Sequence, residues 1–146
     1  MSADDHGSAP AGGAMLGRAL QFGDSMFPIG GFAFSGGLES AIQKRIVTDV
    51  ASLLEFTRTA VEQAARGDGI AIVCAHRAAL AGDIGELLRI DSRVHARKLS
   101  GETRAMSTKM GRKFVELGAH VTSAATMQDW RERVLSGATP GCYPVA

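Results

Sequence analysis

The sequence predicts an all-α fold, a single-domain bundle of about six or seven helices. In several segments, apolar residues recur at the three- and four-residue spacing of amphipathic helices. Aromatic residues make up only 5% of the sequence, and valine, isoleucine and aromatic residues nowhere alternate with polar residues over the length of a strand. A chain of 146 residues with 45% apolar and 21% charged residues is typical of one folded domain. We therefore expect helices packed on helices and no sheet.

The amino-terminal part is predicted to contain a tail, a helix and an unusual loop. Residues 1–14 are small, polar and rich in glycine, so we expect a disordered tail followed by a folded domain over residues 15–146. A helical pattern runs from Leu16 to about Met26, and Pro28 ends it. The segment that begins at Pro28 combines four glycines with three large apolar side chains, which is more glycine than a simple turn needs.

Two helices are predicted next. A short helix over residues 38–45 precedes the strongest helical pattern of the chain, over residues 49–66. Thr48 is the expected N-cap of this longer helix, with Asp49 in its first turn, and Gly67 with the glycine two residues later is expected to end it. Its apolar residues share one face: Val50, Leu53, Leu54, Val61 and Ala64.

The remaining helices are predicted from apolar spacing and capping residues. Residues 70–80 and 83–97 form two of them, and Ser100 is the expected N-cap of the next. Residues 126–129 resemble a capping box that opens a last helix, which extends to about Ser136. The helix that follows Ser100 carries an apolar stripe that we expect to face the core: Met106, Met110, Phe114 and Leu117.

Charge and cysteine content exclude several classes of protein. Sixteen Lys and Arg residues against fifteen Asp and Glu leave a net charge of +1, so we expect neither a nucleic-acid nor a membrane partner from the overall charge. No apolar run is long enough to span a bilayer. Two cysteines cannot form a disulfide framework, and the first residues lack the pattern of a secretory signal, so we expect a cytoplasmic protein.

The segment 93–113 is locally basic, and Glu102 is its one acidic residue. A solvated helical face is the simplest interpretation, and an acidic protein partner is the next. A nucleic-acid-binding regulator stays an alternative, although no aromatic residue is interleaved to stack on bases. The basic residues of this segment are Arg93, Arg97, Lys98, Arg104, Lys109, Arg112 and Lys113.

The glycine-rich loop permits two catalytic interpretations. Gly31 and Gly36 have the spacing of a phosphate-binding loop, but Gly37 and Leu38 stand where that loop needs a lysine and a hydroxyl residue. The residues around Ser35 are one residue away from a nucleophile elbow, so a serine hydrolase that uses Ser35 stays an alternative. That elbow requires a preceding strand, which the sequence does not predict.

Aromatic and metal-ligating residues suggest binding rather than catalysis. Phe27, Phe32 and Phe34 each either fill the core or contact a partner protein. Histidine and cysteine provide no complete metal site. Cys142, free in a loop, is a candidate metal ligand, but one ligand does not make a site.

One part of the sequence resembles a known family. The run from Leu20 to Glu39, followed by residues 47–49, is similar to the amino-terminal signature of the urease accessory protein UreF family. Weaker similarity continues to the turn at residues 143–145, so the resemblance covers about residues 16–146.

This resemblance implies an all-α, non-enzymatic chaperone. Members of the family dimerise and join UreD, also called UreH, and the GTPase UreG to support nickel insertion into apo-urease. The family implies no tightly bound cofactor, because the complex handles the nickel. Phe32 stands where the family places an aromatic residue that we expect to face the GTPase. The residues that match the family pattern, and that we expect to bind partners, are Asp24, Pro28, Gly30, Gly31, Phe32, Ser35, Gly37, Leu38 and Glu39.

The sequence departs from the family in three ways. Phe34 replaces a histidine that is frequent in the family, which weakens the case for metal contact by the loop. Cys142 stands where many relatives carry histidine, so a softer donor is kept. Family members continue past the turn at residues 143–145 through further helices. We therefore expect this chain to be incomplete relative to the family, marginally stable in isolation and prone to self-association.

Overall fold

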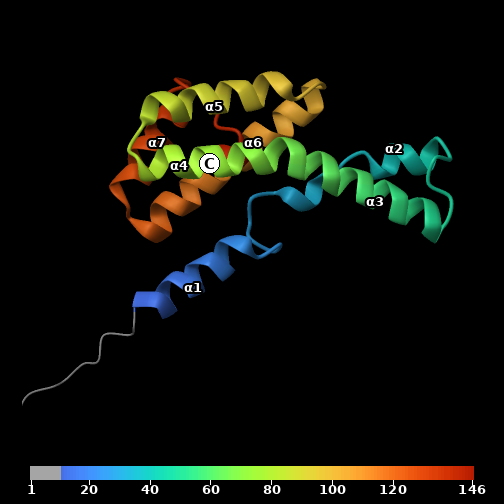
Figure 1. The fold of residues 1–146 in the computed structure, drawn as a ribbon, viewed down its shortest axis with the longest axis horizontal. Coiled ribbons are helices and arrows are strands. Elements are labelled where there is room, and N and C mark those ends of the chain that lie inside the picture. The colour runs from blue at the N-terminus through green and yellow to red at the C-terminus, as the bar shows by residue number, and fades with distance from the viewer. Residues whose placement is uncertain (1–10) are drawn as a thin grey trace, which may run out of the picture.

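The computed structural model describes residues 11–146, which form helices joined by short loops (Figure 1). These residues contain no strand, so the all-α prediction is confirmed. Three short turns of other helical types accompany the α-helices: η1 (Gly31–Ala33) and η3 (Tyr143–Val145) are 3₁₀ turns, and η2 (Ala65–Gly69) is a π turn. The α-helices are α1 (Ala11–Gly23), α2 (Leu38–Gln43), α3 (Val50–Ala64), α4 (Ile70–Leu80), α5 (Ile84–Arg97), α6 (Gly101–Thr122) and α7 (Ala125–Leu135).

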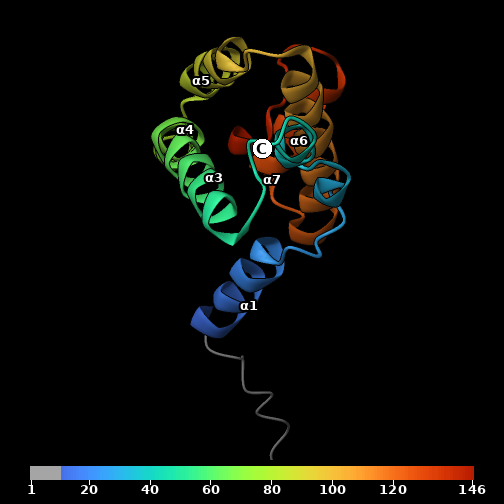
Figure 2. The same ribbon diagram turned by 90° about the vertical axis from the view of Figure 1, so that its right-hand side faces the viewer.

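The first helix starts earlier than the sequence predicts. Residues 11–14 were expected in a disordered tail, but they form the first turn of α1, while residues 1–10 lie outside the described part of the chain. Two of these four residues are glycines, so helix propensity does not explain this early start. Helix α1 projects away from the other helices in both views, and its last turn contacts α6 through Phe22, whose ring lies 5.4 Å from that of Phe114 (Figures 1 and 2). From Gly12 onward its side chains are exposed except that of Phe22, which is half-buried.

Asp49, rather than Thr48, caps α3. The Asp49 carboxylate accepts a hydrogen bond from the Ser52 backbone N–H at 2.8 Å, and the Ser52 hydroxyl accepts one from the Asp49 N–H at 3.0 Å. These two reciprocal bonds are a capping box. The bond from the Ser52 N–H stabilises the charged carboxylate and lowers the pKa of Asp49 below its usual value.

Of the two other predicted N-caps, Ser100 is confirmed and Thr126 is wrong. The Ser100 hydroxyl accepts from the Thr103 N–H at 3.0 Å and caps α6, as predicted. Thr126 does not cap α7, because that helix starts one residue before it, at Ala125. Its N-cap is Ala124, which makes no side-chain capping bond.

Helices α3 and α4 form one nearly continuous helical run through η2 (Figure 1). Gly67 and Gly69 were predicted to end the first of these helices, and this prediction is wrong. A glycine ends a helix when it takes a left-handed conformation. Neither glycine has a positive φ, and Gly69 has φ −60° and ψ −41°, so the chain stays right-handed through the π turn.

The hydrophobic core lies where α4 to α7 surround the carboxy-terminal segment (Figure 2). Helix α4 packs on α5 and α6 packs on α7, while η3 contacts α4, α5 and α6. Within residues 11–146, no helix is both long and apolar enough to cross a bilayer. The larger buried side chains of the core are Leu87, Ile90, Val94, Val115, Trp130, Val134, Cys142 and Val145.

The buried line of α6 is displaced from the predicted stripe. The predicted residues, Met106, Met110, Phe114 and Leu117, are only half-buried. A β-carbon on Gly111 would lie 2.7 Å from the Tyr143 backbone nitrogen and 2.8 Å from the Cys142 carbonyl carbon, so the carboxy-terminal segment rests directly on the helix backbone. This close approach requires small residues. The buried residues of α6 are Ser107, Gly111, Val115, Gly118 and Ala119.

A buried carboxylate on α5 fixes the same segment. Asp91 is fully buried, and it accepts hydrogen bonds from the Thr139 hydroxyl at 2.5 Å and from the Gly141 and Cys142 backbone N–H groups at 2.7 Å each. This role of Asp91 was not predicted from the sequence. The sequence does contain a sign of it, because Asp91 is the one acidic residue on the apolar face that α5 turns toward the core.

Helix α3 is correctly predicted as a helix, but none of its residues is buried. Val50 is 82% exposed and Val61 is 62% exposed, so the apolar face identified in the sequence is open to solvent in this structure.

Candidate partner-binding loop

The loop between α1 and α2 contains seven of the nine residues predicted to bind partners, and the other two, Leu38 and Glu39, begin α2. It starts with a tight turn in which the Asp24 carboxylate accepts from the Met26 N–H at 2.8 Å and the Asp24 carbonyl accepts from the Phe27 N–H at 3.0 Å. The Asp24 side chain therefore shapes the loop locally. Seven of the nine predicted residues are exposed, and Gly31 and Leu38 are half-buried.

Three of the loop glycines have a left-handed backbone. Gly30 has a φ of +83° and begins the 3₁₀ turn η1, while Gly36 and Gly37 have φ values of +62° and +91° directly before α2. Residues with a β-carbon are strained in this region of backbone space. No other atom lies within 4 Å of a β-carbon built on any of the three, so glycine is required here by backbone conformation and not by crowding.

An aromatic cluster holds the start of the loop against α6 and η3. The Phe27 ring lies 5.2 Å from that of Phe22 and 5.8 Å from that of Phe114, and Phe114 lies 5.7 Å from Tyr143. These edge-on or tilted contacts are favourable for aromatic rings. Phe114 was predicted to face the core, but its contacts with Phe22, Phe27 and Tyr143 were not predicted.

The loop phenylalanines therefore differ in their environment. Phe27 belongs to the aromatic cluster and Phe34 is half-buried, whereas Phe32 is 77% exposed at the centre of the 3₁₀ turn η1. Next to it, Gly31 approaches α6, because a β-carbon at Gly31 would lie 3.5 Å from the Met110 methyl carbon. The loop is thus anchored before Phe32, and this large apolar side chain is exposed.

The structure gives the catalytic interpretation of this loop no support. A nucleophile elbow needs a strand before the serine, but the segment before Ser35 comes from helix α1 and the 3₁₀ turn η1. Within residues 11–146, no hydrogen bond joins the Ser35 hydroxyl to a histidine or a carboxylate.

Cys142 is in the core rather than at a surface where it could bind metal. Its exposure is 0%, and its backbone N–H is bonded to Asp91. Burial, reinforced by the neighbouring Asp91 carboxylate, raises the pKa of the Cys142 thiol to about 12. Within residues 11–146, no group of three or more His, Cys, Asp or Glu side chains is placed to hold a metal ion.

The two thiols are expected to differ in reactivity. Cys74 is exposed on α4, whereas Cys142 is buried with a raised pKa, and the thiolate is the reactive form. We expect a thiol reagent such as Ellman's reagent to modify one thiol rapidly in the folded protein and two after unfolding in guanidinium. The Cys74→Ser variant should lose the rapid phase and Cys142→Ser should keep it. Two rapid thiols in the folded protein would contradict this placement of Cys142.

The basic segment 93–113 is partly neutralised by acidic residues from elsewhere. Lys98 pairs with Asp68 on η2 at 2.6 Å, and Arg112 and Lys113 lie 3.5 Å and 3.6 Å from Glu116. Neither Asp68 nor Glu116 lies within this segment, so the sequence pattern did not predict these ion pairs. Arg93, Arg97 and Lys109 have no ion pair among the described residues.

Comparisons with known proteins agree on one family. The family model described as UreF matches residues 47–146. Urease accessory protein UreF 2 of Brucella canis is 54% identical over 127 residues, which are 87% of this chain and 52% of the relative. Urease accessory protein UreF of Yersinia pseudotuberculosis serotype IB is 48% identical over 128 residues, 88% of this chain and 56% of the relative. The chain thus spans about half the length of the curated relatives it matches, and no solved structure matches it significantly.

Proposed function

Because this chain belongs to the UreF family of urease accessory proteins, we propose that it acts as a non-catalytic chaperone in urease maturation. In this proposal it joins UreD (UreH) and the GTPase UreG on apo-urease, and the assembled complex inserts nickel into the enzyme. Nickel is the cargo of the complex, and the chain holds no cofactor tightly itself. It acts in the cytoplasm and is a homodimer within the complex.

The observation that carries this proposal is the exposure of Phe32 on an anchored loop. An apolar ring that is 77% exposed contributes little to its own fold, while aromatic residues are frequent among the energetically dominant residues of protein interfaces. The alignments with the Brucella and Yersinia proteins cover 127 and 128 residues of this chain. Fewer than 24 residues lie outside either alignment, so both alignments include the loop that begins at Asp24. The loop therefore lies within the region that aligns with these urease accessory proteins.

The experiment that tests the proposal separates binding from folding. We expect a tagged chain, expressed with a urease operon that lacks its own UreF, to co-purify with UreD and UreG. Phe32→Ala should weaken the affinity for UreG about 30-fold, as expected for a hot-spot residue worth about 2 kcal/mol, so that less UreG is recovered, and should leave the thermal midpoint unchanged.

Phe27→Ala is the matched control. Phe27 lies in the aromatic cluster, so its loss should lower the thermal midpoint, because truncation of a buried phenylalanine costs about 3–5 kcal/mol and of a half-buried one somewhat less. Undiminished recovery of UreG with Phe32→Ala would remove the loop from the proposed interface. A large fall in its thermal midpoint would assign Phe32 a structural role instead.

A further inference from the structure

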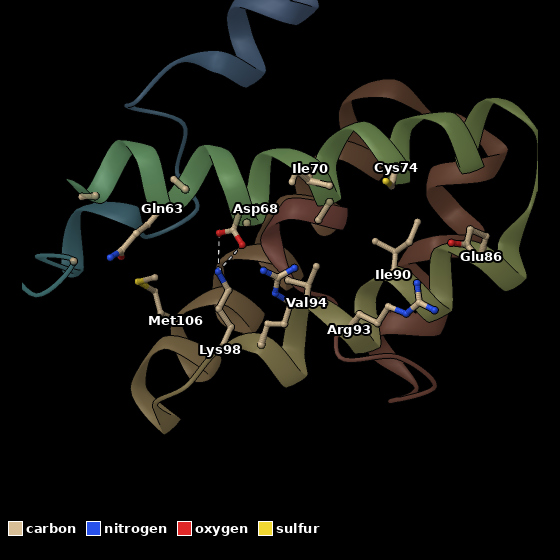
Figure 3. A pocket seen from close by; sticks show the side chains of 16 residues that line it. Gln63, Asp68, Ile70, Cys74, Glu86, Ile90, Arg93, Val94, Lys98 and Met106 are labelled. Atoms are coloured by element: carbon tan, nitrogen blue, oxygen red, sulfur yellow. Dashed lines mark hydrogen bonds and ion pairs between the residues drawn. The ribbon is translucent and has the colours of Figure 1, made fainter. Parts of the chain in front are cut away.

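A groove of about 650 Å³ runs between the α3–α4 run and α5, and Gly36 of the loop before α2 also lines it (Figure 3). One wall comes from α3, η2 and α4 and includes Gln63, Asp68 and Cys74. The other wall is α5, with Ile90 and Arg93. The groove therefore has a helix on either side, which is the shape that accommodates a third helix.

The base of the groove is apolar and its width is held by an ion pair. Ile70, Ile90, Val94 and Met106 supply apolar surface from three different helices. Lys98 donates to both carboxylate oxygens of Asp68, at 2.8 Å and 2.6 Å, and this pair connects the two walls (Figure 3). Asp68 belongs to the π turn η2, and π turns within helical runs are frequent at functional sites.

The groove has an excess of positive charge along its lining. Glu86 is paired with Arg89 at 2.8 Å, and Asp68 is paired with Lys98, so both acidic groups of the lining already have a partner in this chain. Arg93 and Arg97 also line the groove, are exposed, and have no ion pair among the described residues. They lie one turn apart on α5, so their guanidinium groups share one face of that helix.

We propose that this groove binds an acidic amphipathic helix of a partner protein, with its apolar face on the groove base and two carboxylates, one turn apart, on Arg93 and Arg97. Arginine is well suited to this contact, because its guanidinium group binds a carboxylate through two parallel hydrogen bonds. Gly36 of the Phe32 loop also lines the groove, whereas Phe32 itself does not, and the proposal does not rest on the proposed function.

The test uses the 146-residue chain and two labelled peptides. Each peptide has about 15 residues, enough for a marginal helix, with leucines along one face. The first carries glutamates one turn apart beside the leucines, and the second carries lysines at the same positions. We expect fluorescence anisotropy to show saturable binding of the glutamate peptide and at least about tenfold weaker binding of the lysine peptide.

Substitutions in the groove should reverse this preference. The double variant Arg93→Glu and Arg97→Glu should weaken binding of the glutamate peptide at least about tenfold and strengthen that of the lysine peptide. Lys109→Glu with Arg112→Glu, on the exposed side of α6, makes the same change in net charge outside the groove and should leave both affinities unchanged. Attachment of a bulky maleimide to Cys74, which lines the groove and is exposed, should abolish binding without any substitution.

Several outcomes would overturn the proposal. Equal binding of the two peptides would show that charge does not select the occupant, and binding that survives both the Arg93/Arg97 double variant and the Cys74 block would place it elsewhere. Sedimentation that shows a dimer of the unmodified chain, broken by the Cys74 block, would identify a second copy as the occupant instead.

Discussion

Replacement of Asp91 by alanine is expected to abolish cooperative folding, or to reduce it to a marginal level. The carboxylate is fully buried and accepts three hydrogen bonds, from Thr139, Gly141 and Cys142. Its loss leaves two buried backbone N–H groups and one hydroxyl without a partner, at a cost of about 1–3 kcal/mol each. A folded domain of this size has a free energy of unfolding of about 5–15 kcal/mol, so the loss consumes most of it.

Urea denaturation followed by circular dichroism measures this effect, with Asp129→Ala as the control. Asp129 is also an aspartate on a helix, but its ion pair with Arg133 at 3.0 Å is partly open to solvent, so its loss should cost no more than about 1 kcal/mol. Asp91→Asn should also be strongly destabilising, because an amide offers one oxygen where the three donors use two. An Asp91→Ala variant within about 1 kcal/mol of the parent would mean that the segment 139–142 is not held by this residue.

Gly111→Ala is expected to be the most damaging single-methyl addition in the described part of the chain. The new β-carbon would overlap the carbonyl oxygen of Gly141 and lie 2.7 Å from the Tyr143 nitrogen. These are backbone atoms, which cannot rotate away as the end of a side chain can. We expect a loss of about 3 kcal/mol or more, at the upper end of what overpacking usually costs, and separation of η3 from α6.

Gly101→Ala tests whether the effect comes from the contact and not from the helix. Gly101 lies in the same helix, and no other atom lies within 4 Å of a β-carbon built on it, so its substitution should be neutral or slightly stabilising. The thermal midpoints of the two variants give the comparison. Equal midpoints would show that the carboxy-terminal segment does not rest on α6. If both prove stable, tryptophan fluorescence, from Trp130 in the adjoining core, can show whether η3 has moved.

The structure agrees best with the sequence-based predictions where the interactions are local. The start of α5 at Asp83 and the Ser100 cap of α6 agree with the sequence, because the capping oxygen and the N–H that it accepts from lie within three residues. Helical periodicity depends on the chain's own backbone, so the all-α class also follows from the sequence. Where two adjacent residues compete for one cap, as Thr48 and Asp49 do, the position of Ser52 decides, and it favours Asp49.

The sequence of the glycine-rich loop predicts its backbone conformation but not the environment of its phenylalanines. Its glycines indicate an unusual backbone, and three of them have positive φ, which is a property of the residue type. Which of its phenylalanines faces outward depends on Phe114 and Tyr143, more than 75 residues later in the chain. The sequence therefore identified the segment and its exposed aromatic candidate, while the anchoring of Phe27 was decided by α6 and η3.

The sequence by itself determined the family, the helical class and the positions of most helices, because each is encoded in short runs of residues. The tertiary structure alone decided which helix faces are buried. The line of small residues on α6, and not its methionine and phenylalanine stripe, became the buried face because a distant segment packs directly on Gly111. Asp91 holds the carboxy-terminal segment, Cys142 is buried, and Arg93 and Arg97 line a groove. Each of these positions results from contacts with residues far away in the sequence. Burial depends on which distant segments pack together, and a single sequence does not predict which segments will do so.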